Sequence, residues 1–299
     1  NLFENSFRLA KKYTNNRGQD LFAYKLNVSY MQALDWEANN MAAVDGTTST
    51  NNPGGYDAVN RYGDEDSDGN LNDITGDFNQ NYDTHPGLKK WHRTGYLEKD
   101  IVDYNTKNLK AQSSLHYMIK PNIELIYSFN YSTGTTVYQG DNRFSLKNIQ
   151  FWQNKIEISQ KDKFFVRAYR TKEDAGDSYD AVFTALKLQN YNQPLSNPNQ
   201  EWYTDYKNNW RDNFDWSDID WSSATLIFNP LTFESDWYFN GEKIDISEWM
   251  VMSDSVINAN TDFIIATHNE VRILTDLESN RLEPGSEEFR NALKEITSK

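Results

Sequence analysis

The stretch FAYKLNVSY at residues 22–30 alternates apolar and polar side chains one for one. Successive side chains of an extended strand point to opposite faces of the sheet, so this pattern predicts a strand with one apolar and one polar face. Residues 109–117 and 123–131 repeat the pattern. On the apolar face of the first run we expect Phe22, Tyr24, Leu26, Val28 and Tyr30.

The same reasoning, extended along the chain, predicts six strands that are long for a soluble domain, where strands usually have about 5–6 residues. We expect them at residues 6–13, 21–34, 103–118, 123–133, 146–159 and 164–171. The last pair alternates less regularly, because Ile149 and Phe151 fall on the polar side.

The connections between these strands alternate between short and long. Short turns are expected at residues 15–19, 120–122 and 160–162, and longer connections at residues 35–100, at residues 134–142 and after residue 173. An outer-membrane β-barrel has short periplasmic turns and long extracellular loops. The order therefore predicts an all-β fold, an antiparallel up-and-down transmembrane β-barrel segment (an incomplete barrel) with long extracellular loops carrying short helices. A soluble β-sandwich is the alternative.

Composition narrows the function classes. Hydrophobic residues make up 37% of the chain and its mean hydropathy is −0.84, so no 20-residue apolar helix is expected. Aromatic residues reach 14%, which suits the interfacial girdles of a barrel or an aromatic-rich soluble sheet. The absence of cysteine excludes disulfides, cysteine metal sites and thiol nucleophiles. A net charge of −14 argues against nucleic acid as a partner.

The charge imbalance also suggests how the chain is organised. From Glu201 onward there are 20 acidic and 8 basic residues, so this part alone carries a net charge of −12. We expect barrel strands and loops over residues 1–190 and an acidic extracellular loop region with short helices over residues 191–299. Helices are predicted at 201–212, at 270–278 and after Pro284-Gly285, where Ser286 can cap a helix with Phe289 on its apolar face.

Several phrases of the sequence resemble TonB-dependent receptors of the SusC-like kind. They are YKLNVSYMQALDWEANN at 24–40, NPGGYDAVNRYGD at 52–64, TGTTVYQGDNRFSL at 133–146, FFVRAYRTKEDAGDSYDAVFT at 164–184 and NRLEPGSEEF at 280–289. Such receptors are outer-membrane barrels of 22 strands with an N-terminal plug. They import oligosaccharides, peptides or chelated metals with energy relayed by TonB, often beneath a surface lipoprotein lid.

The resemblance implies a receptor in the bacterial outer membrane rather than an enzyme. Its partners would be outer-membrane lipid, the remainder of the barrel and the plug, TonB acting through that plug, and a lipoprotein lid. The chain departs from the family in having six or seven strands and no plug, TonB box or closing strand, and it begins without an initiator Met or signal peptide, so we expect a piece of a longer protein. Residues 213–269, with four tryptophans, match nothing in the family and are interpreted as a loop insertion: Trp216, Trp221, Trp237 and Trp249.

Calcium is the one cofactor that the residues suggest. Asp64, Asp66, Asp68 and Gly69 form D-x-D-x-D-G, the opening of a calcium loop, and Asn70 follows as a further oxygen donor. Thr75 stands at the twelfth position, where such a loop carries Glu, and no flanking helices are evident. A solvated acidic loop is the alternative.

Two groups of residues are candidates for ligand contact, because aromatic rings and polar side chains together suit sugars or peptides. The first group lies in the first long loop and consists of Trp36, Glu37, Asn39, Tyr56, Asp57, Asn60, Arg61 and Tyr62. The second lies after the sixth strand, by resemblance near the extracellular mouth, and consists of Asp174, Asp177 and Tyr179. Packing of the loop on itself is the alternative for the first group.

No catalytic residues are predicted, because no two carboxylates are spaced as in a glycosidase and the four histidines show no ligand spacing. His116 alternates onto the polar face with Lys25, Lys110, Glu124 and Arg167, which would wet a barrel interior. A function of another class also fits the sequence, namely a soluble extracellular glycan-binding β module that uses the tryptophan-rich region.

Overall fold

The computed structural model describes residues 2–47, 49–64, 87–88, 90–140, 142–192, 198–214, 224–239, 241–245 and 258–298. The chain divides into two compact units. The first contains Asn1–Ala38, Glu98–Thr184 and Leu293–Lys299, and the second contains Asn39–Leu97 and Ala185–Ala292. The expected division was a single boundary at residue 190. In the structure most of the first long loop, Asn39–Leu97, instead forms one unit with Ala185–Ala292.

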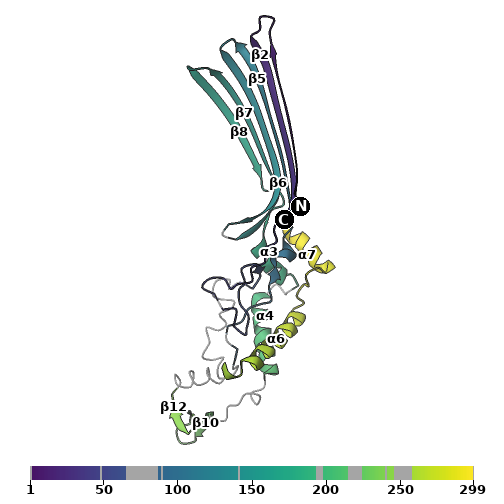
Figure 1. Ribbon diagram of the computed structural model, residues 1–299. Coiled ribbons are helices and arrows are strands. Elements are labelled where there is room, and N and C mark those ends of the chain that lie inside the picture. Colours follow the sequence, from purple (N-terminus) through teal and green to yellow (C-terminus); the bar gives the residue numbers. More distant parts are fainter. Residues whose placement is uncertain are drawn as a thin grey trace. The chain divides into compact units, whose positions relative to one another are not determined.

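The first unit is built on one antiparallel sheet whose six main strands follow each other in chain order (Figure 1). The strands are β1 (Leu2–Thr14), β2 (Asp20–Leu34), β5 (Asn105–Lys120), β6 (Ile123–Gln139), β7 (Arg143–Gln160) and β8 (Phe164–Asp174). The short strand β9 (Tyr179–Asp180) pairs with the beginning of β7. All six predicted strands are present, and the mostly β, antiparallel character of the fold is confirmed. Within the described residues the sheet is open, with β1 and β8 as its outer strands and no closed barrel.

The strands are long because their alternation is largely maintained up to the turns, although Ile149 and Phe151 depart from it in β7. They contain 13, 15, 16, 17, 18 and 11 residues. Gly18 ends the first turn with a positive φ of 74°, a conformation that glycine adopts without steric cost. Its N–H donates to the Asn15 carbonyl over 2.9 Å, and this closes the β1–β2 turn.

A buried ion pair joins the start of β7 to the long connection that precedes β5. Helix α2 (Glu98–Ile101) buries the Glu98 carboxylate completely. Arg143, at the start of β7, donates to this carboxylate through Nε and Nη at 3.0–3.2 Å, and the Tyr104 hydroxyl donates to Glu98 Oε1 over 2.7 Å. The Tyr179 hydroxyl in β9 donates to the Ile101 carbonyl over 2.7 Å. The bonds from Arg143 and Tyr104 satisfy the Glu98 charge, which would otherwise be costly to bury.

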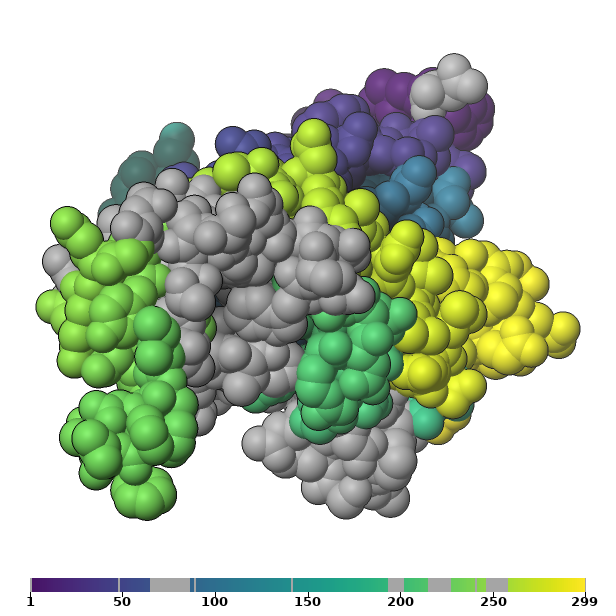
Figure 2. All heavy atoms as spheres, turned by 90° about the horizontal axis from the view of Figure 1, so that it is seen from below, coloured from purple at the N-terminus to yellow at the C-terminus, as the bar shows by residue number. Residues whose placement is uncertain are grey.

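The second unit has a core of aromatic side chains between helices. Helix α4 (Pro198–Asn213) packs against α6 (Thr261–Glu278), and Figure 2 shows the atoms of α4, in green, bordering those of α6, in yellow-green. The fully buried members of this core include Trp91, Trp202, Tyr206 and Trp210. The two-stranded sheet of β3 (Arg61–Tyr62) and β4 (Tyr96–Leu97) lies in the same unit.

His268 lies within this aromatic core as a neutral side chain. Its Nε2 donates to the Gly87 carbonyl over 3.0 Å, which leaves Nδ1 to accept from the Tyr206 hydroxyl at 2.6 Å. Burial lowers the pKa of His268 to about 3. The histidine is therefore a satisfied core residue.

The predicted helices after residue 200 are present, with wider bounds. Helix α7 (Glu287–Thr297) begins as expected, since the Phe289 N–H donates to Ser286 Oγ over 3.0 Å. Helix α3 (Ala181–Gln189) was not expected. The expectation that strands end after residue 173 was wrong, because β10 (Ala224–Asn229), β11 (Glu234–Phe239) and β12 (Glu242–Ile244) form a second antiparallel sheet. Among the described residues no helix is both long and apolar enough to cross a membrane.

Candidate functional site

The main sheet has one face that is apolar from its first strand to its last. Residues directly opposite each other in an antiparallel pair share a face, so the register defines rows across the sheet. One such row crosses all six strands as Tyr13, Phe22, Tyr117, Leu125, Ile158 and Val166. The exposed fraction is 48% for Tyr117 and 68% for Val166. The face is therefore apolar and uncovered in this part of the chain.

Aromatic rings gather toward both ends of this face. Tyr13, Phe22 and Tyr24 lie near the short turns with ring centroids 6.1–6.4 Å apart. Toward the other end, the rings of Tyr131 and Trp152 lie 5.7 Å apart. Tyr30 lies eight positions after Phe22 along β2, which corresponds to about 27 Å of strand. This spacing is similar to the apolar band of about 25 Å, flanked by aromatic girdles, in outer-membrane barrels.

Two charged side chains of the apolar face lie toward its ends, whereas Arg170 lies in the row of Leu26, on the outer strand β8. Lys11 Nζ lies 4.9 Å from the centroid of the Tyr13 ring, and Lys172 Nζ lies 5.0 Å from that of Trp152. Long basic side chains at such positions can cover apolar surface with their stems while the ammonium group reaches water.

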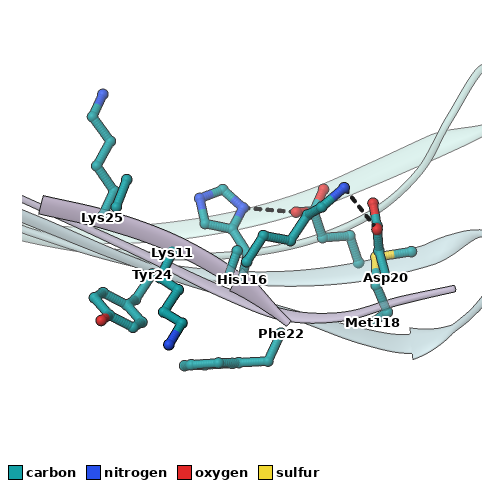
Figure 3. A pocket seen from close by; sticks show the side chains of 11 residues that line it. Lys11, Asp20, Phe22, Tyr24, Lys25, His116 and Met118 are labelled. Carbon is teal, nitrogen blue, oxygen red and sulfur yellow. Dashed lines mark hydrogen bonds and ion pairs between the residues drawn. The ribbon is translucent and has the colours of Figure 1, made fainter. Parts of the chain in front are cut away.

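The opposite face is polar, as the alternation predicts. Figure 3 shows Phe22 and Tyr24 on one side of the strands and Lys25 and His116 on the other. The polar side carries an ion pair from His116 Nδ1 to Glu124 Oε1 at 2.7 Å and another from Lys12 Nζ to Asp20 Oδ1 at 2.9 Å. Both pairs are drawn in Figure 3, where they border a hollow of about 440 Å³. Further along this face, Arg167 Nε lies 2.8 Å from Glu157 Oε2, and Lys110 also belongs to this side.

The predicted ligand-binding residues of the first long loop fall into different units. Trp36 and Glu37 follow β2 in the first unit, and the Trp36 side chain is 76% exposed. Asn39 belongs to the second unit and is exposed. Trp36 and Glu37 are thus accessible for contact with a ligand, and their role remains a prediction.

The other predicted residues of this loop are engaged within it. Tyr56 donates from its hydroxyl to the Met41 carbonyl over 2.9 Å, and Asn60 Oδ1 accepts from the Asn40 N–H at 2.8 Å. Arg61 stacks over the Tyr56 ring at 4.9 Å and donates to its carbonyl. Asp57 and Tyr62 are buried, with 7% and 5% of their surfaces exposed. These contacts are those expected from packing of the loop on itself.

The predicted residues after β8 lie in the first unit and form a compact turn. Asp174 Oδ1 accepts from the Gly176 N–H over 3.0 Å, and Asp177 Oδ2 accepts from Asn148 Nδ2 over 2.8 Å. Tyr179 is half-buried, and burial raises the pKa of its hydroxyl. Asp174 and Asp177 retain free carboxylate lone pairs toward solvent, so contact with a ligand at this turn stays a prediction.

Of the proposed calcium ligands, only Asp64 lies in the described part of the chain; Asp66, Asp68 and Asn70 lie outside it. Asp64 is fully buried, and Oδ2 accepts from Arg61 Nε. Burial raises the pKa of Asp64 to about 7, although the Arg61 guanidinium acts in the opposite direction. Over the described residues, no three His, Cys, Asp or Glu side chains gather as metal ligands would.

Two polar arrangements were not predicted from the sequence, namely the Glu98–Arg143 ion pair and the hydrogen bond from Tyr206 to His268. Their partners lie 45 and 62 residues apart, and no local pattern links them. No family model matches the chain, and neither a curated protein nor a solved structure matches it. Function is therefore inferred from the two faces of the main sheet and from the resemblance of its sequence.

Proposed function

We propose that this chain forms part of the wall and the extracellular loops of a TonB-dependent outer-membrane receptor of the SusC-like kind, which binds and imports a solute. The observation that carries the proposal is the predominantly apolar face that extends across six strands and is uncovered in the part of the chain that the structure describes. An exposed apolar surface of this extent is unfavourable in water and favourable against hydrocarbon.

The order of the connections supports the same proposal. β1–β2, β5–β6 and β7–β8 are joined by tight turns, which an up-and-down sheet brings to one end. The connections from β2 to β5 and after β8 are long and leave from the opposite end. At that end β6 and β7 are joined by only three residues, 140–142, so the longer connection expected over residues 134–142 was wrong. A barrel wall places its short turns on the periplasmic side and its long loops outside the cell.

In this proposal the two faces have different solvents. The apolar face meets lipid between its aromatic margins, and the polar face with Lys25, His116 and Glu124 lines a water-filled interior. Exposed loop residues such as Trp36 capture the solute, and rearrangement of the plug, pulled by TonB, admits it. The open edges at β1 and β8 would pair with further strands of the same barrel, because unpaired backbone groups are costly in lipid.

Fluorescent probes attached to single cysteines test which face meets lipid. The natural chain has no cysteine, so Leu26→Cys and Asn27→Cys each provide one labelling site on adjacent, oppositely directed residues. After refolding into phosphatidylcholine vesicles, a label at position 26 should be quenched by nitroxides attached to the lipid chains. A label at position 27 should instead be quenched by iodide from water.

The alternative, a soluble glycan-binding module, gives a different result. The chain would then run as a monodisperse species in buffer without detergent. Neither label would respond to the lipid-attached nitroxides. That pair of results would overturn the receptor proposal.

A further inference from the structure

Each of the three tight turns of the main sheet carries or adjoins a basic side chain. Figure 1 shows these turns together at the upper end of the sheet. The first turn holds Arg17, β5 ends on Lys120 at the second, and the third holds Lys161 and Lys163. We call these four residues the turn cations. All four are exposed, and among the described residues none of them makes an ion pair.

The positive charge at this end contrasts with the charge of the whole chain. The first unit has 19 basic and 16 acidic residues, a net charge of +3, whereas the second has 11 basic and 28 acidic residues, a net charge of −17. Close to the turns, the Asp20 carboxylate is paired with Lys12 at 2.9 Å. Asp162 is the one acidic residue within the turns, so the turn cations and Asp162 together carry a net charge of +3.

The spacing of the turns lets their charges act together. Neighbouring strands lie about 4.8 Å apart, so successive hairpins lie about 10 Å apart. This distance is similar to the Debye length of about 10 Å at 0.1 M ionic strength. The fields of the three turns therefore overlap in physiological salt, and a row of negative charges would be attracted by all of them.

Exposed apolar side chains adjoin the turn cations. Ile119 directly precedes Lys120, and its side chain is 47% exposed. Phe164 directly follows Lys163 and is also 47% exposed. At the first turn the neighbouring ring is that of Tyr13, in the aromatic margin of the apolar face. An apolar group beside an ammonium or guanidinium group fits the boundary between hydrocarbon and charged headgroups.

We propose that the turn cations form an interaction surface for anionic phospholipid headgroups, such as those of phosphatidylglycerol. Lipid phosphates accept charge-assisted hydrogen bonds from lysine and arginine, and the adjoining apolar side chains can contact the acyl chains. The proposal rests on the proposed function in placing the apolar face in a bilayer. It adds the charge of the headgroups and the leaflet in which they lie, namely the leaflet at the short turns, which faces the periplasm.

The apolar neighbours favour lipid over another polyanion. An acidic protein segment or a nucleic acid would pair with the cations and leave the side chains of Ile119 and Phe164 in water. A phospholipid provides a partner for both kinds of group at the same place, because its phosphate and its acyl chains adjoin each other. Charge complementarity and apolar contact therefore point to the same occupant.

A fluorophore at the turns measures which lipid gathers there. Asn122→Cys provides one exposed labelling site in the second turn of a chain that has no natural cysteine. The full chain is refolded into phosphatidylcholine vesicles that contain a small fraction of nitroxide-labelled phosphatidylglycerol or nitroxide-labelled phosphatidylcholine, with the nitroxide near the headgroup. The ratio of the two quenching constants is the preference for the anionic lipid. We expect a ratio of about 5 at low salt, the effect of roughly one basic residue near each lipid. In 1 M salt, where the Debye length is about 3 Å, the ratio should approach one.

A variant assigns this preference to the turns. Arg17→Gln/Lys120→Gln/Lys163→Gln, made in the labelled chain, removes one cation from each turn and should lower the ratio to less than about 2. Polyglutamate, added at the same concentration of negative charge, represents an acidic protein partner. The natural turns should keep their preference for phosphatidylglycerol in its presence.

The matched control removes the same charge elsewhere. Lys187→Gln/Lys207→Gln/Lys294→Gln changes one lysine on each of the helices α3, α4 and α7. Its ratio at the labelled turn should equal that of the natural chain. A second label, at Gln139→Cys, reports on the other end of β6 and should show a smaller ratio than the label at the turn.

Several results would overturn this proposal. They are a ratio near one for the natural turns at low salt, equal ratios for the turn variant and the control variant, or a larger ratio at position 139 than at position 122. A ratio that polyglutamate lowers to one would assign the turns to an acidic polypeptide instead of lipid.

The outcomes also separate this proposal from the receptor proposal. If lipid nitroxides quench the label at position 26 while the ratio at position 122 is one, the receptor proposal stands and the headgroup surface falls. If the label at position 26 is not quenched while the turn variant abolishes a preference at position 122, the receptor proposal falls and the headgroup surface stands. If neither label responds to lipid, both proposals fall.

Discussion

Tyr127 and Asn154 are diagonal neighbours on the apolar side of β6 and β7, and the Tyr127 hydroxyl donates to Asn154 Oδ1 over 2.7 Å. Asn154 occupies an apolar-face position in β7, opposite Phe129 and Arg170. In the proposed membrane wall, the hydrogen bond would provide the amide oxygen with a partner that lipid cannot provide. A polar group on this face is therefore tolerated because its neighbour satisfies it.

This relationship predicts how the two residues respond to substitution. Tyr127→Phe should lower the free energy of unfolding in lipid vesicles by about 1–3 kcal/mol, because the Asn154 amide oxygen loses its donor. Asn154→Leu in the same chain should restore the stability, since neither position of the pair then carries a polar group. Urea titrations monitored by tryptophan fluorescence measure both effects, and an unchanged midpoint for Tyr127→Phe would contradict the lipid-facing assignment.

Charge placed on the two faces should have opposite consequences. Leu26→Arg or Leu125→Arg puts a guanidinium on the apolar face and should oppose assembly in a membrane by about 2–4 kcal/mol at mid-bilayer depth. Asn27→Arg and Ser128→Arg are the matched changes on the polar face and should be tolerated. The measurement is the fraction of chain that becomes protease-resistant in phosphatidylcholine vesicles, and equal yields for both pairs would mean that neither face meets hydrocarbon.

Alternation along single strands was sufficient to predict the main sheet. Leu26 and Asn27 lie on opposite faces because period two is a property of any strand, and the tight turns then fix the antiparallel order. The alignment of Gln112, Asn130 and Gln153 across the polar face could not be predicted in the same way, because these residues become neighbours only through the register between strands. A slip of one residue would have placed them on the other face.

The second unit was less predictable for a different reason. Its core joins Trp91 to Trp202 and Trp210 across more than a hundred residues, and such contacts leave no periodic signal in the sequence. β10 is a six-residue strand, ATLIFN, with an apolar segment of three residues, which is too short to distinguish a strand from a helical segment by its pattern. By contrast, the start of α7 was predictable, because Ser286 and its two following glutamates act within one helical turn.

The buried ion pair at the end of the sheet gives a third prediction. Arg143→Ala removes the guanidinium from the buried Glu98 carboxylate, to which the Tyr104 hydroxyl still donates, and this should destabilise the first unit by about 3–5 kcal/mol. Arg143→Lys should recover only part of this loss, because an ammonium group cannot make the paired contacts of a guanidinium. Hydrogen exchange of the β7 and β9 amides provides the measurement, and Arg167→Ala, in an exposed pair at the other end of the sheet, is the control.

Asp64 gives a prediction for the pH dependence of the second unit. Its carboxyl has a pKa of about 7 in the folded chain and 3.8 as the ordinary value, with burial as the main cause of the difference. Between these pH values the folded state binds the proton more tightly than the unfolded state, so the free energy of unfolding should fall as the pH rises from about 4 to about 7. The full effect is about 4 kcal/mol.

Asp64→Asn removes this titration and isolates its contribution. His268 acts in the opposite direction, because its pKa is lowered to about 3 from 6.5 and its contribution to stability is lost as the pH falls through that range. The difference in unfolding free energy between Asp64→Asn and the natural chain cancels the His268 contribution, which both share. Urea unfolding at pH 4, 5.5, 7 and 8, followed by the fluorescence of the buried tryptophans, should show this difference moving in favour of the variant as the pH rises. If the unfolding free energies of the two proteins depend on pH in the same way, Asp64 ionises in the folded chain over the same pH range as in the unfolded chain. The Arg61 guanidinium would then compensate the cost of burying its charge.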